Sequence, residues 1–528
     1  MNQNLASNLL TQLQGIVGAD GLILDDDLRN FYSTDIRGKC ETTMAIVQPG
    51  SVNELQAVVA ASAAANVAVV PRGGGASYSS GYAINTPASI TLDMSKLNRI
   101  LEVNKTNSTV TVEAGVTWEA LNKKLTGCSL RTPFYGPFSG GIATIGGSLA
   151  QHAASLGSAG FGISADSVLN LDVVAGDGTL ISTGSKSAVD GINFFRYFGP
   201  DLTGIFLGDC GALGIKARIT LRLMPRRAYR SFLSFSFESF EQLADGMASV
   251  ARLGVADCCF GNDPACLEQM MRAQDTSIEA GKIIAKAVFA DAPNPVAGAW
   301  RLSKMVLTGQ SFLKKAGYTC HVICDGHSHA EVRQKLALAR KAASRYGRKI
   351  PNTIPMVISS NPYFSIPQPM AEEIRRGIPQ HGVVPFDRVK ELHGKIQSLY
   401  NKYKKDMQSY DVRTETMFSA ISTHAFLYEP VLTWADTPSE FHAHYFRKEF
   451  AGIAISAKEN PNGRELVAQL QTETARIFSD IGAINFQLGK TYPFWERYQE
   501  DSKPLLLALK ATLDPKGILN PGALGLPA

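Results

Sequence analysis

The 528-residue sequence lacks several features that would place it in a class at once. Its eight cysteines are scattered and form no evident disulfide framework, so a reducing, cytoplasmic location is expected. No run of about eighteen apolar residues occurs, so no transmembrane helix is expected. The first residues also lack the basic start and apolar run of a secretory signal. A net charge of +5 is nearly balanced for this length and gives no reason to expect nucleic acid as a partner.

Two common phosphate-binding signatures are missing as well. The sequence has neither the GxGxxG of a Rossmann fold nor the GK[ST] of a P-loop. What it has is VVPRGGGASYSSGY (69–82), in which three glycines follow a β-branched run and an arginine. Glycines let the main chain touch a ligand, and successive N–H groups can form a concave site for an anion such as a diphosphate. Alone, this signal is weak, because glycine clusters are more often turns.

The residues around this loop predict an α+β arrangement. Ser51 and Glu54 form a capping box that begins a helix, Asn66 is a plausible stop, and 67–71 is a buried strand that leads into the glycines. Further strands are expected at 88–94, 98–104, 108–115 and 212–225, a helix begins near Thr117, and 168–183 is a hairpin with its turn at Asp177-Gly178.

A second glycine-rich stretch, ATIGGSLA (143–150), strengthens the case for an anion site. Its small residues open an expected helix whose N-terminus could face the same diphosphate. Two such loops, each beside a strand, are hard to explain as ordinary turns.

The pattern changes after Arg227. Strand-then-helix patterns occur twice, and 417–434 looks like one long strand. This half of the chain predicts an antiparallel sheet backed by helices.

Four ordered segments carry a family resemblance: PRGGGASYSSGY, ATIGGSLAQHAASLGSAGFGISADSVLNLDVVAGDGTLIS, GPDLTGIFLGDCGALGIKARITLRLMP and LDPKGILNPG. They resemble the FAD-binding domain of the vanillyl-alcohol oxidase (para-cresol methylhydroxylase-type) flavoproteins. The resemblance implies an α+β fold: a two-subdomain FAD-binding domain at 1–225, an α+β cap domain at 226–480, and a C-terminal return to the FAD-binding domain at 481–528.

The resemblance also implies which residues hold FAD. The first loop would wrap the diphosphate, Tyr82 would close it, and the later motifs would line the other side of the cofactor. The implied residues are Arg72, Gly73, Gly74, Gly75, Ala76, Ser77, Tyr82, Thr144, Gly146, Gly147, Ser148, His152, Gly162, Asp166, Gly214, Ile215 and Asn520.

The residue after the three glycines decides how the flavin is attached. Many relatives carry a histidine there that is linked covalently to the flavin, whereas this sequence has Ala76. Non-covalent FAD is therefore expected. A tether from the cap remains open at His424, His442 or His444.

Within the family, the sequence looks closest to the 2-hydroxy acid dehydrogenases of the glycolate oxidase large-subunit and D-lactate dehydrogenase type. That resemblance implies a small alcohol-type substrate, hydride transfer to flavin N5, and oxygen, a quinone or a cytochrome as the next electron acceptor. The residues expected to act are His424 as base, Lys490 beside the reduced flavin, Arg413 as carboxylate ligand, and Tyr428. The expected histidine-rich segment is replaced by Asn485-Phe486-Gln487, so no metal is expected.

Two alternatives stay open. Oxidation of 4-substituted phenols would use a tyrosine cluster drawn from Tyr135, Tyr428 and Tyr492, assisted by Asp166. A different class is a flavin-carrying subunit of a larger electron-transfer complex. A homo-oligomer is compatible with each.

Two histidine patterns have simpler explanations. The pattern Cys320-His321-x-x-Cys324 lies in an alternating strand that sends Cys320 and His321 to opposite faces, and Ser328 or a neighbour caps the next helix. Structural roles are therefore favoured over a metal site. His442 and His444 would share a face in a strand and diverge in a helix.

Overall fold

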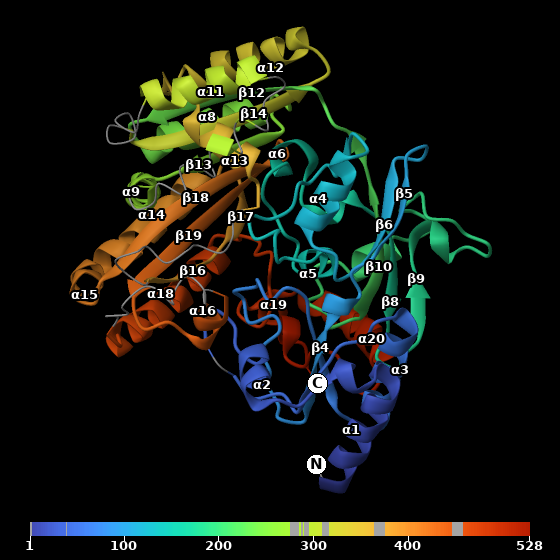
Figure 1. Cartoon of the computed structure of the whole chain (residues 1–528). Helices are drawn as coiled ribbons and strands as arrows, with labels where there is room; N and C mark the ends of the chain where they lie inside the picture. Colours follow the sequence, from blue (N-terminus) through green and yellow to red (C-terminus); the bar gives the residue numbers. More distant parts are fainter. Residues whose placement is uncertain are drawn as a thin grey trace.

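The computed structural model describes residues 3–38, 40–274, 285–286, 289, 295–308, 316–363, 375–445 and 458–527. Two bodies lie side by side in Figure 1: a blue-to-cyan part that contains both chain ends, and a green-to-orange cap. The last, red segment of the chain lies with the first body.

The N-terminal body contains a four-stranded sheet, a five-stranded sheet and a short two-stranded sheet of β7 (Leu130–Arg131) and β11 (Met224–Pro225). The four-stranded sheet has the order β1-β2-β4-β3, in which β4 pairs in parallel with both β2 and β3. Its strands and helices are α1 (Gln3–Val17), β1 (Leu22–Ile23), α2 (Asp26–Tyr32), β2 (Ala45–Val47), α3 (Val52–Ala64), β3 (Ala68–Arg72) and β4 (Ser89–Asp93). The predicted N-cap at Ser51 is confirmed, because Ser51 Oγ accepts from the N–H of Glu54 at 3.2 Å. The other half of the expected capping box differs, since the Glu54 carboxylate accepts from the N–H of Gly50 at 2.8 Å and from the Ser51 hydroxyl at 3.1 Å.

The five-stranded antiparallel sheet has the order β5-β6-β10-β8-β9. Its strands are β5 (Ile100–Asn104), β6 (Thr109–Glu113), β8 (Val168–Val174), β9 (Leu180–Ser182) and β10 (Ile215–Arg222). Helices α4 (Trp118–Thr126), α5 (Ile145–Ala150), α6 (Ser158–Phe161) and α7 (Leu202–Ile205) lie between these strands in the chain. The hairpin predicted at Asp177-Gly178 joins β8 to β9, with Gly178 at φ +88°.

The cap is built on an antiparallel sheet of order β15-β12-β14-β13-β18-β19-β16, with β17 also paired to β19. Its strands are β12 (Tyr229–Phe237), β13 (Cys258–Asn262), β14 (Tyr318–Gly326), β15 (Arg348–Ile350), β16 (Arg375–Pro379), β17 (Gly382–Pro385), β18 (Val412–Ile421) and β19 (Ala425–Ala435).

One face of the cap sheet packs against helices in a single apolar core. These helices are α8 (Phe240–Ala251), α12 (His329–Ala343), α14 (Val389–Lys402) and α18 (Pro461–Asp480). On the other side, α9 (Pro264–Gln274) and α13 (Thr353–Ser360) cover part of the strands. The expected antiparallel sheet backed by helices is confirmed.

The strand expected at 417–434 is wrong in one respect. The segment is two antiparallel strands, β18 and β19, joined by a turn at Ser422-Thr423-His424 in which Ser422 has φ +50°. None of the three turn residues is a glycine, proline, asparagine or aspartate, so Ser422-Thr423 is the whole of the turn signal there, and it is a weak one.

The C-terminal segment returns to the first sheet. After α19 (Phe494–Arg497) and α20 (Lys503–Leu513), residues 518–520 run beside β3. The N–H of Val69 donates to the carbonyl of Ile518 at 2.8 Å, and the N–H of Asn520 donates to the carbonyl of Val69 at 2.9 Å. The tail thereby supports the strand that leads into the glycine loop.

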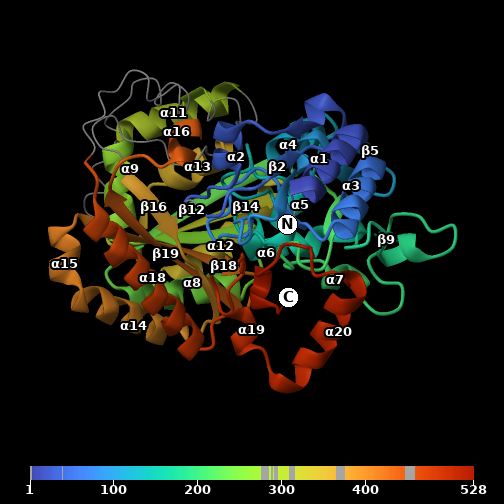
Figure 2. The ribbon, with the colours of Figure 1, turned by 90° about the horizontal axis from the view of Figure 1, so that it is seen from below.

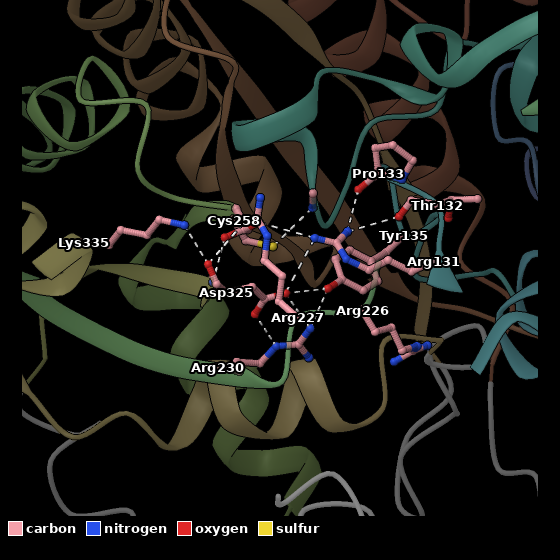
Figure 3. A network of polar contacts seen from close by, with 12 residues as sticks. Arg131, Thr132, Pro133, Tyr135, Arg226, Arg227, Arg230, Cys258, Asp325 and Lys335 are labelled. Carbon is pink, nitrogen blue, oxygen red and sulfur yellow. Dashed lines mark hydrogen bonds and ion pairs between the residues drawn. The ribbon is translucent and has the colours of Figure 1, made fainter. Parts of the chain in front are cut away.

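A buried ionic network joins the cap to the first body (Figure 3). Arg131, from β7 (Leu130–Arg131), lies 3.4 Å from the carboxylate of Asp257 and 3.7 Å from that of Asp325, both on the cap. Tyr135 donates to Asp325 at 2.9 Å, and Arg230 of β12 binds the same carboxylate at 2.7 Å. Arg131 and both aspartates are almost completely buried, so this network fixes how the cap sheet sits on the first body.

Candidate flavin site and active site

The glycine loop after β3 is shaped by close backbone approaches. A Cβ on Gly74 would overlap the carbonyl of Ile142, and one on Gly73 would overlap the hydroxyl of Thr144. Gly75 has φ +66°, a conformation that L-residues rarely adopt. The two glycine-rich stretches therefore touch each other, as the sequence suggested, and larger side chains have no room at this contact.

The loop leaves backbone donors available. Within the described chain, the N–H groups of Gly73, Gly75, Ala76 and Ser77 have no hydrogen-bond acceptor. The neighbouring helix α5 differs, because the N–H groups of its first turn already have partners. They donate to Val116 O, Ala114 O, the Thr144 hydroxyl and Thr144 O. The expectation that this helix N-terminus faces a diphosphate is not supported, and the loop supplies the free donors instead.

Arg72 lies under this loop, 2% exposed, with its guanidinium stacked over Phe31, Tyr32 and Tyr82 at 4.7, 4.3 and 5.0 Å. Its Nη1 is buried without a partner among the described residues. A buried cationic donor without an acceptor is costly unless a ligand pairs with it. Tyr82 closes the loop by donating to the carbonyl of Gly75 at 2.8 Å. These features fit the phosphates of FAD.

Two further implied residues also leave buried polar atoms open. His152 has φ +54° and its Nδ1 is buried without a partner in the described chain; burial lowers the pKa of its imidazole. Asn520 donates to the carbonyls of Gly81 and Cys210, both at 2.7 Å, while its Oδ1 is buried and unpaired among the described residues. Both side chains are therefore placed to meet a polar ligand beside the loop.

The remaining implied residues pack or form turns. Gly146 packs on Ala114, and Ser148 accepts from the indole of Trp118 at 2.8 Å. Gly147 donates its N–H to the Thr144 hydroxyl that caps α5, and Gly214-Ile215 leads into β10 against Val173. Asp166 is exposed and accepts from the N–H of Ile163 at 2.7 Å, beside Gly162 at φ +79°.

A second polar cluster, the Tyr78 cluster, lies just beyond the loop. It consists of Tyr78, His381, Glu429, Gln487 and Tyr492. Tyr78 donates to Glu429 Oε1 at 3.2 Å, and the Gln487 amide donates to the Tyr78 hydroxyl at 3.3 Å. Tyr78 is only two residues after Ala76, so this cluster sits at the end of the glycine loop.

The other half of the Tyr78 cluster is a tyrosine–histidine pair. The His381 N–H donates to the Tyr492 hydroxyl at 3.0 Å, and that hydroxyl lies 2.9 Å from His381 Nδ1. Since the hydroxyl accepts from the backbone, its own proton is free to point to Nδ1, which leaves the imidazole proton on Nε2. Burial lowers the pKa of His381 to about 3, so the ring is neutral. Its Nε2 is buried and has no partner among the described residues.

The electrostatics of the cluster favour proton transfer at Glu429. Burial raises the pKa of Glu429 to about 7, opposed by the hydrogen bond from Tyr78. Burial also raises the pKa of Tyr78 well above its usual value, as it does for Tyr492. At neutral pH both tyrosines stay protonated, while Glu429 exchanges a proton easily.

The residues expected to act lie apart from this cluster, with one exception. His424 is exposed in the β18–β19 turn, and Arg413 forms an exposed ion pair with Asp411 at 3.0 Å. Tyr428 points to the opposite face of β19, into the cap core, where its hydroxyl lies 2.9 Å from His393 Nδ1. Lys490 does lie at the loop: its N–H donates to Ser79 O at 2.9 Å and its ammonium to Ala83 O at 2.6 Å.

Sequence reasoning missed Glu429, Tyr78 and His381. The signal was within reach for Glu429, because its neighbour Tyr428 was already among the residues expected to act. Adjacent strand residues face opposite sides, so the choice between them depends on which face of the sheet is covered by helices.

The contacts of His321 and His444 are structural, while the side chain of His442 lies outside the described residues. His321 contacts Ser234 at 2.9 Å and Thr319 at 3.2 Å inside β14, while Cys320 contacts Cys259 on the other face. Residues 440–445 form helix α16 (Glu440–Tyr445), in which the His444 ring stacks on Phe31. Throughout the described ranges, no group of three or more histidine, cysteine or acidic residues could hold a metal ion.

All eight cysteines are free thiols. None of the helices that the structure describes combines the length and apolarity needed to cross a bilayer.

Comparison with known proteins agrees with this site. Residues 43–184 match the family model described as an FAD binding domain. The chain is 29% identical over 247 residues to the glycolate oxidase subunit GlcD of Bacillus subtilis (strain 168), covering 47% of this chain and about half, 51%, of that protein. It is 24% identical over 524 residues to the glycolate oxidase subunit GlcD of Escherichia coli (strain K12), covering 98% and 90%.

The fold agrees with a solved structure of p-cresol methylhydroxylase with substrate bound. The TM-score is 0.74 at 14% identity, and the match covers 100% of this chain and 98% of that one. The free loop donors, the Nη1 of Arg72 that has no partner among the described residues, and these matches lead to one conclusion. The chain carries an FAD-binding domain over residues 43–184 and shares the fold of p-cresol methylhydroxylase.

Proposed function

We propose that this flavoprotein oxidises a hydroxyl-bearing carbon of a small molecule, with a 2-hydroxy acid as the substrate class. The observation that carries the proposal is the Tyr78 cluster at the end of the glycine loop, with a carboxyl whose pKa is raised to about 7. The names of its relatives, glycolate oxidase subunits, point to the same class of substrate.

Bound FAD would accept the hydride that leaves the substrate carbon. Glu429, when ionised, takes the proton of the substrate hydroxyl, so that loss of a hydride and a proton leaves a carbonyl group. Tyr78 stays protonated and orients the carboxylate, while Gln487 orients Tyr78. His381 presents its Nε2–H as a donor to an oxygen of the substrate or cofactor, since Tyr492 fixes the other nitrogen.

A 2-hydroxy acid also needs a cation for its carboxylate. Arg37 is a candidate, because its positive charge acts on Tyr492 and, within the described ranges, no carboxylate lies close enough to its guanidinium to form an ion pair. The Arg37 N–H donates to Asp35 Oδ1 at 2.8 Å, and Asp35 interacts with Ser80 of the glycine-loop segment. Arg37 thereby sits between this segment and the Tyr78 cluster.

Oxidation of 4-substituted phenols is the second candidate. It is favoured by two tyrosine hydroxyls in one cluster, Tyr78 and Tyr492, and by the fold shared with p-cresol methylhydroxylase. Against it, the group that Tyr78 contacts is the carboxyl of Glu429, which repels a phenolate once ionised. A flavin-carrying subunit that works only with a partner remains the third candidate.

The first experiment is the visible spectrum of the purified chain before and after acid precipitation. We propose non-covalent FAD, because Ala76 cannot form the bond that a histidine would. Flavin in the supernatant supports this, and flavin in the pellet contradicts it. Anaerobic bleaching of the flavin is then tested with D-lactate, glycolate and a 4-alkylphenol. Bleaching by a hydroxy acid supports the proposal, bleaching by the phenol alone favours the second candidate, and no bleaching without a partner protein favours the third.

A further inference from the structure

A loop of the FAD-binding domain exposes an unusual amount of apolar surface. Of the seventeen large hydrophobic side chains that are exposed among the described residues, seven lie between residues 189 and 202. They are Val189 (94% exposed), Ile192 (65%), Phe194 (53%), Phe195 (50%), Tyr197 (56%), Phe198 (59%) and Leu202 (44%). We name residues 186–202 the aromatic loop. Clustered exposed apolar side chains of this kind mark interaction sites, whereas single ones need no explanation.

The base of the aromatic loop is held in one shape. Ser185 donates to Ile192 O at 2.6 Å and accepts from the N–H groups of Phe194 and Phe195 at 3.3 and 3.1 Å. The amide of Asn170, on β8, donates to Phe195 O at 3.3 Å. Because the backbone is already ordered, the exposed rings can be buried by a partner at a low cost in conformational entropy.

The charges of the loop cancel. Arg196 pairs with Asp201 at 2.9 Å and also donates to Ala165 O at 3.0 Å. The remaining charges are Lys186 and Asp190, both exposed and neither in an ion pair within the described chain. The loop therefore offers an apolar centre with one free cation and one free anion.

The loop is placed to meet another molecule. It follows β9, the edge strand of the five-stranded sheet. In Figure 2 it projects from the side of the FAD-binding body, opposite the cap. A projecting, rigid apolar loop fits either a protein surface or a lipid surface. Attraction to anionic lipid needs an excess of basic residues, which this loop does not have.

We propose that the aromatic loop is a self-association surface that binds the same loop of a second copy of this chain. In a two-fold dimer each patch meets itself, so Lys186 of one copy faces Asp190 of the other, and the reverse pair forms by symmetry. This reciprocal pairing satisfies both free charges of each copy at once, while Ile192 and Phe198 supply the apolar contact. The proposal is independent of the reaction that the flavin carries out.

The test is the molar mass of the purified chain by light scattering over a dilution series. The wild type is expected to be a dimer. The double variant I192S/F198S is expected to raise the dimer dissociation constant by about tenfold or more. The matched control L505S changes a leucine that is 69% exposed on α20, and should stay dimeric. Flavin content should match the wild type in both variants, since these side chains lie on the surface of the single chain.

Charge reversal makes the test specific for the two-fold arrangement. K186E and D190K are each expected to weaken the dimer by about tenfold, because each places like charges together. The double variant K186E/D190K should restore it, and so should an equimolar mixture of the two single variants, in which both cross-pairs become attractive. A monomeric wild type, a dimer insensitive to I192S/F198S, or no rescue in the double variant and the mixture would overturn the proposal. So would a monomer that sediments with phosphatidylcholine vesicles through this loop.

Discussion

Replacement of Glu429 by glutamine tests the proposed base directly. The pKa of this carboxyl is raised to about 7, so the ionised fraction is about one half at pH 7 and about one tenth at pH 6. If the ionised form takes the substrate proton, the second-order rate of flavin reduction should rise about tenfold per pH unit below 7 and level off above pH 8. Glutamine cannot accept that proton. E429Q should therefore lower the rate of flavin reduction reached at high pH by roughly 100- to 10,000-fold, and the rate should no longer rise with pH near pH 7.

The assay is anaerobic stopped-flow bleaching of the flavin by the best hydroxy acid, followed from pH 5.5 to 9 as a set of about eight points. Glu415 provides the matched control: it faces the same side of the sheet on β18, two register positions away from the Met417–Glu429 pair, and burial raises its pKa to about 8. E415Q should keep the rise in the rate of flavin reduction near pH 7. Y78F should move that rise to higher pH, because the hydrogen bond from Tyr78 lowers the pKa of Glu429. If the rise persists in E429Q, or if that variant reduces its flavin at the wild-type rate, the assignment of Glu429 as the base is refuted.

Three further predictions concern the cofactor loop, the substrate carboxylate and the domain contact. G74A places a methyl group against the carbonyl of Ile142, so this variant should purify with less than about a tenth of the wild-type flavin, as measured by absorbance. G394A is the control: its methyl group meets open space, and its flavin content should match the wild type. R37M should raise KM for a hydroxy acid by about 10- to 100-fold with a smaller change in kcat. An equal rise in KM for an uncharged alcohol would contradict binding of the substrate carboxylate by Arg37. R131M leaves Asp257 and Asp325 buried without this partner and should cost about 3–5 kcal/mol in urea unfolding. R413M breaks an exposed pair and should cost under about 1 kcal/mol.

The parts of the fold that could be predicted from the sequence are those with local causes. The helix start at Ser51 and the hairpin at Asp177-Gly178 each depend on a few adjacent residues, and both formed as expected. The glycine loop was also recognisable, since only glycine tolerates the approach of Ile142 to Gly74. The sequence could not show that N–H groups in the first turn of α5 donate to the carbonyls of Ala114 and Val116, because those acceptors come from another segment of the chain.

The residues expected to act on the substrate lie apart from the Tyr78 cluster for a different reason: the sequence does not show which face of a strand is covered by helices. The turn at Ser422 carries no glycine, proline, asparagine or aspartate, so β18 and β19 looked like one strand and His424 looked like part of it. Once the strands separate, the helices of the cap cover the face that carries Tyr428 and leave Glu429 on the other face. Both residues lie in an equally apolar run, and nothing in that run says which face the helices will cover.

The polar half of the site is assembled only where three distant segments meet. Tyr78 comes from the glycine loop, Glu429 from the cap sheet, and Gln487 and Tyr492 from the returning C-terminal segment. His381 lies in the break between β16 and β17, where its backbone N–H is free to bind Tyr492 rather than a neighbouring strand. Each hydrogen bond of the cluster therefore crosses from one segment to another, and its geometry depends on how firmly the cap is held. The buried contact of Arg131 with Asp257, just before β13, and with Asp325, on β14, contributes to that hold, because both strands belong to the same cap sheet as Glu429.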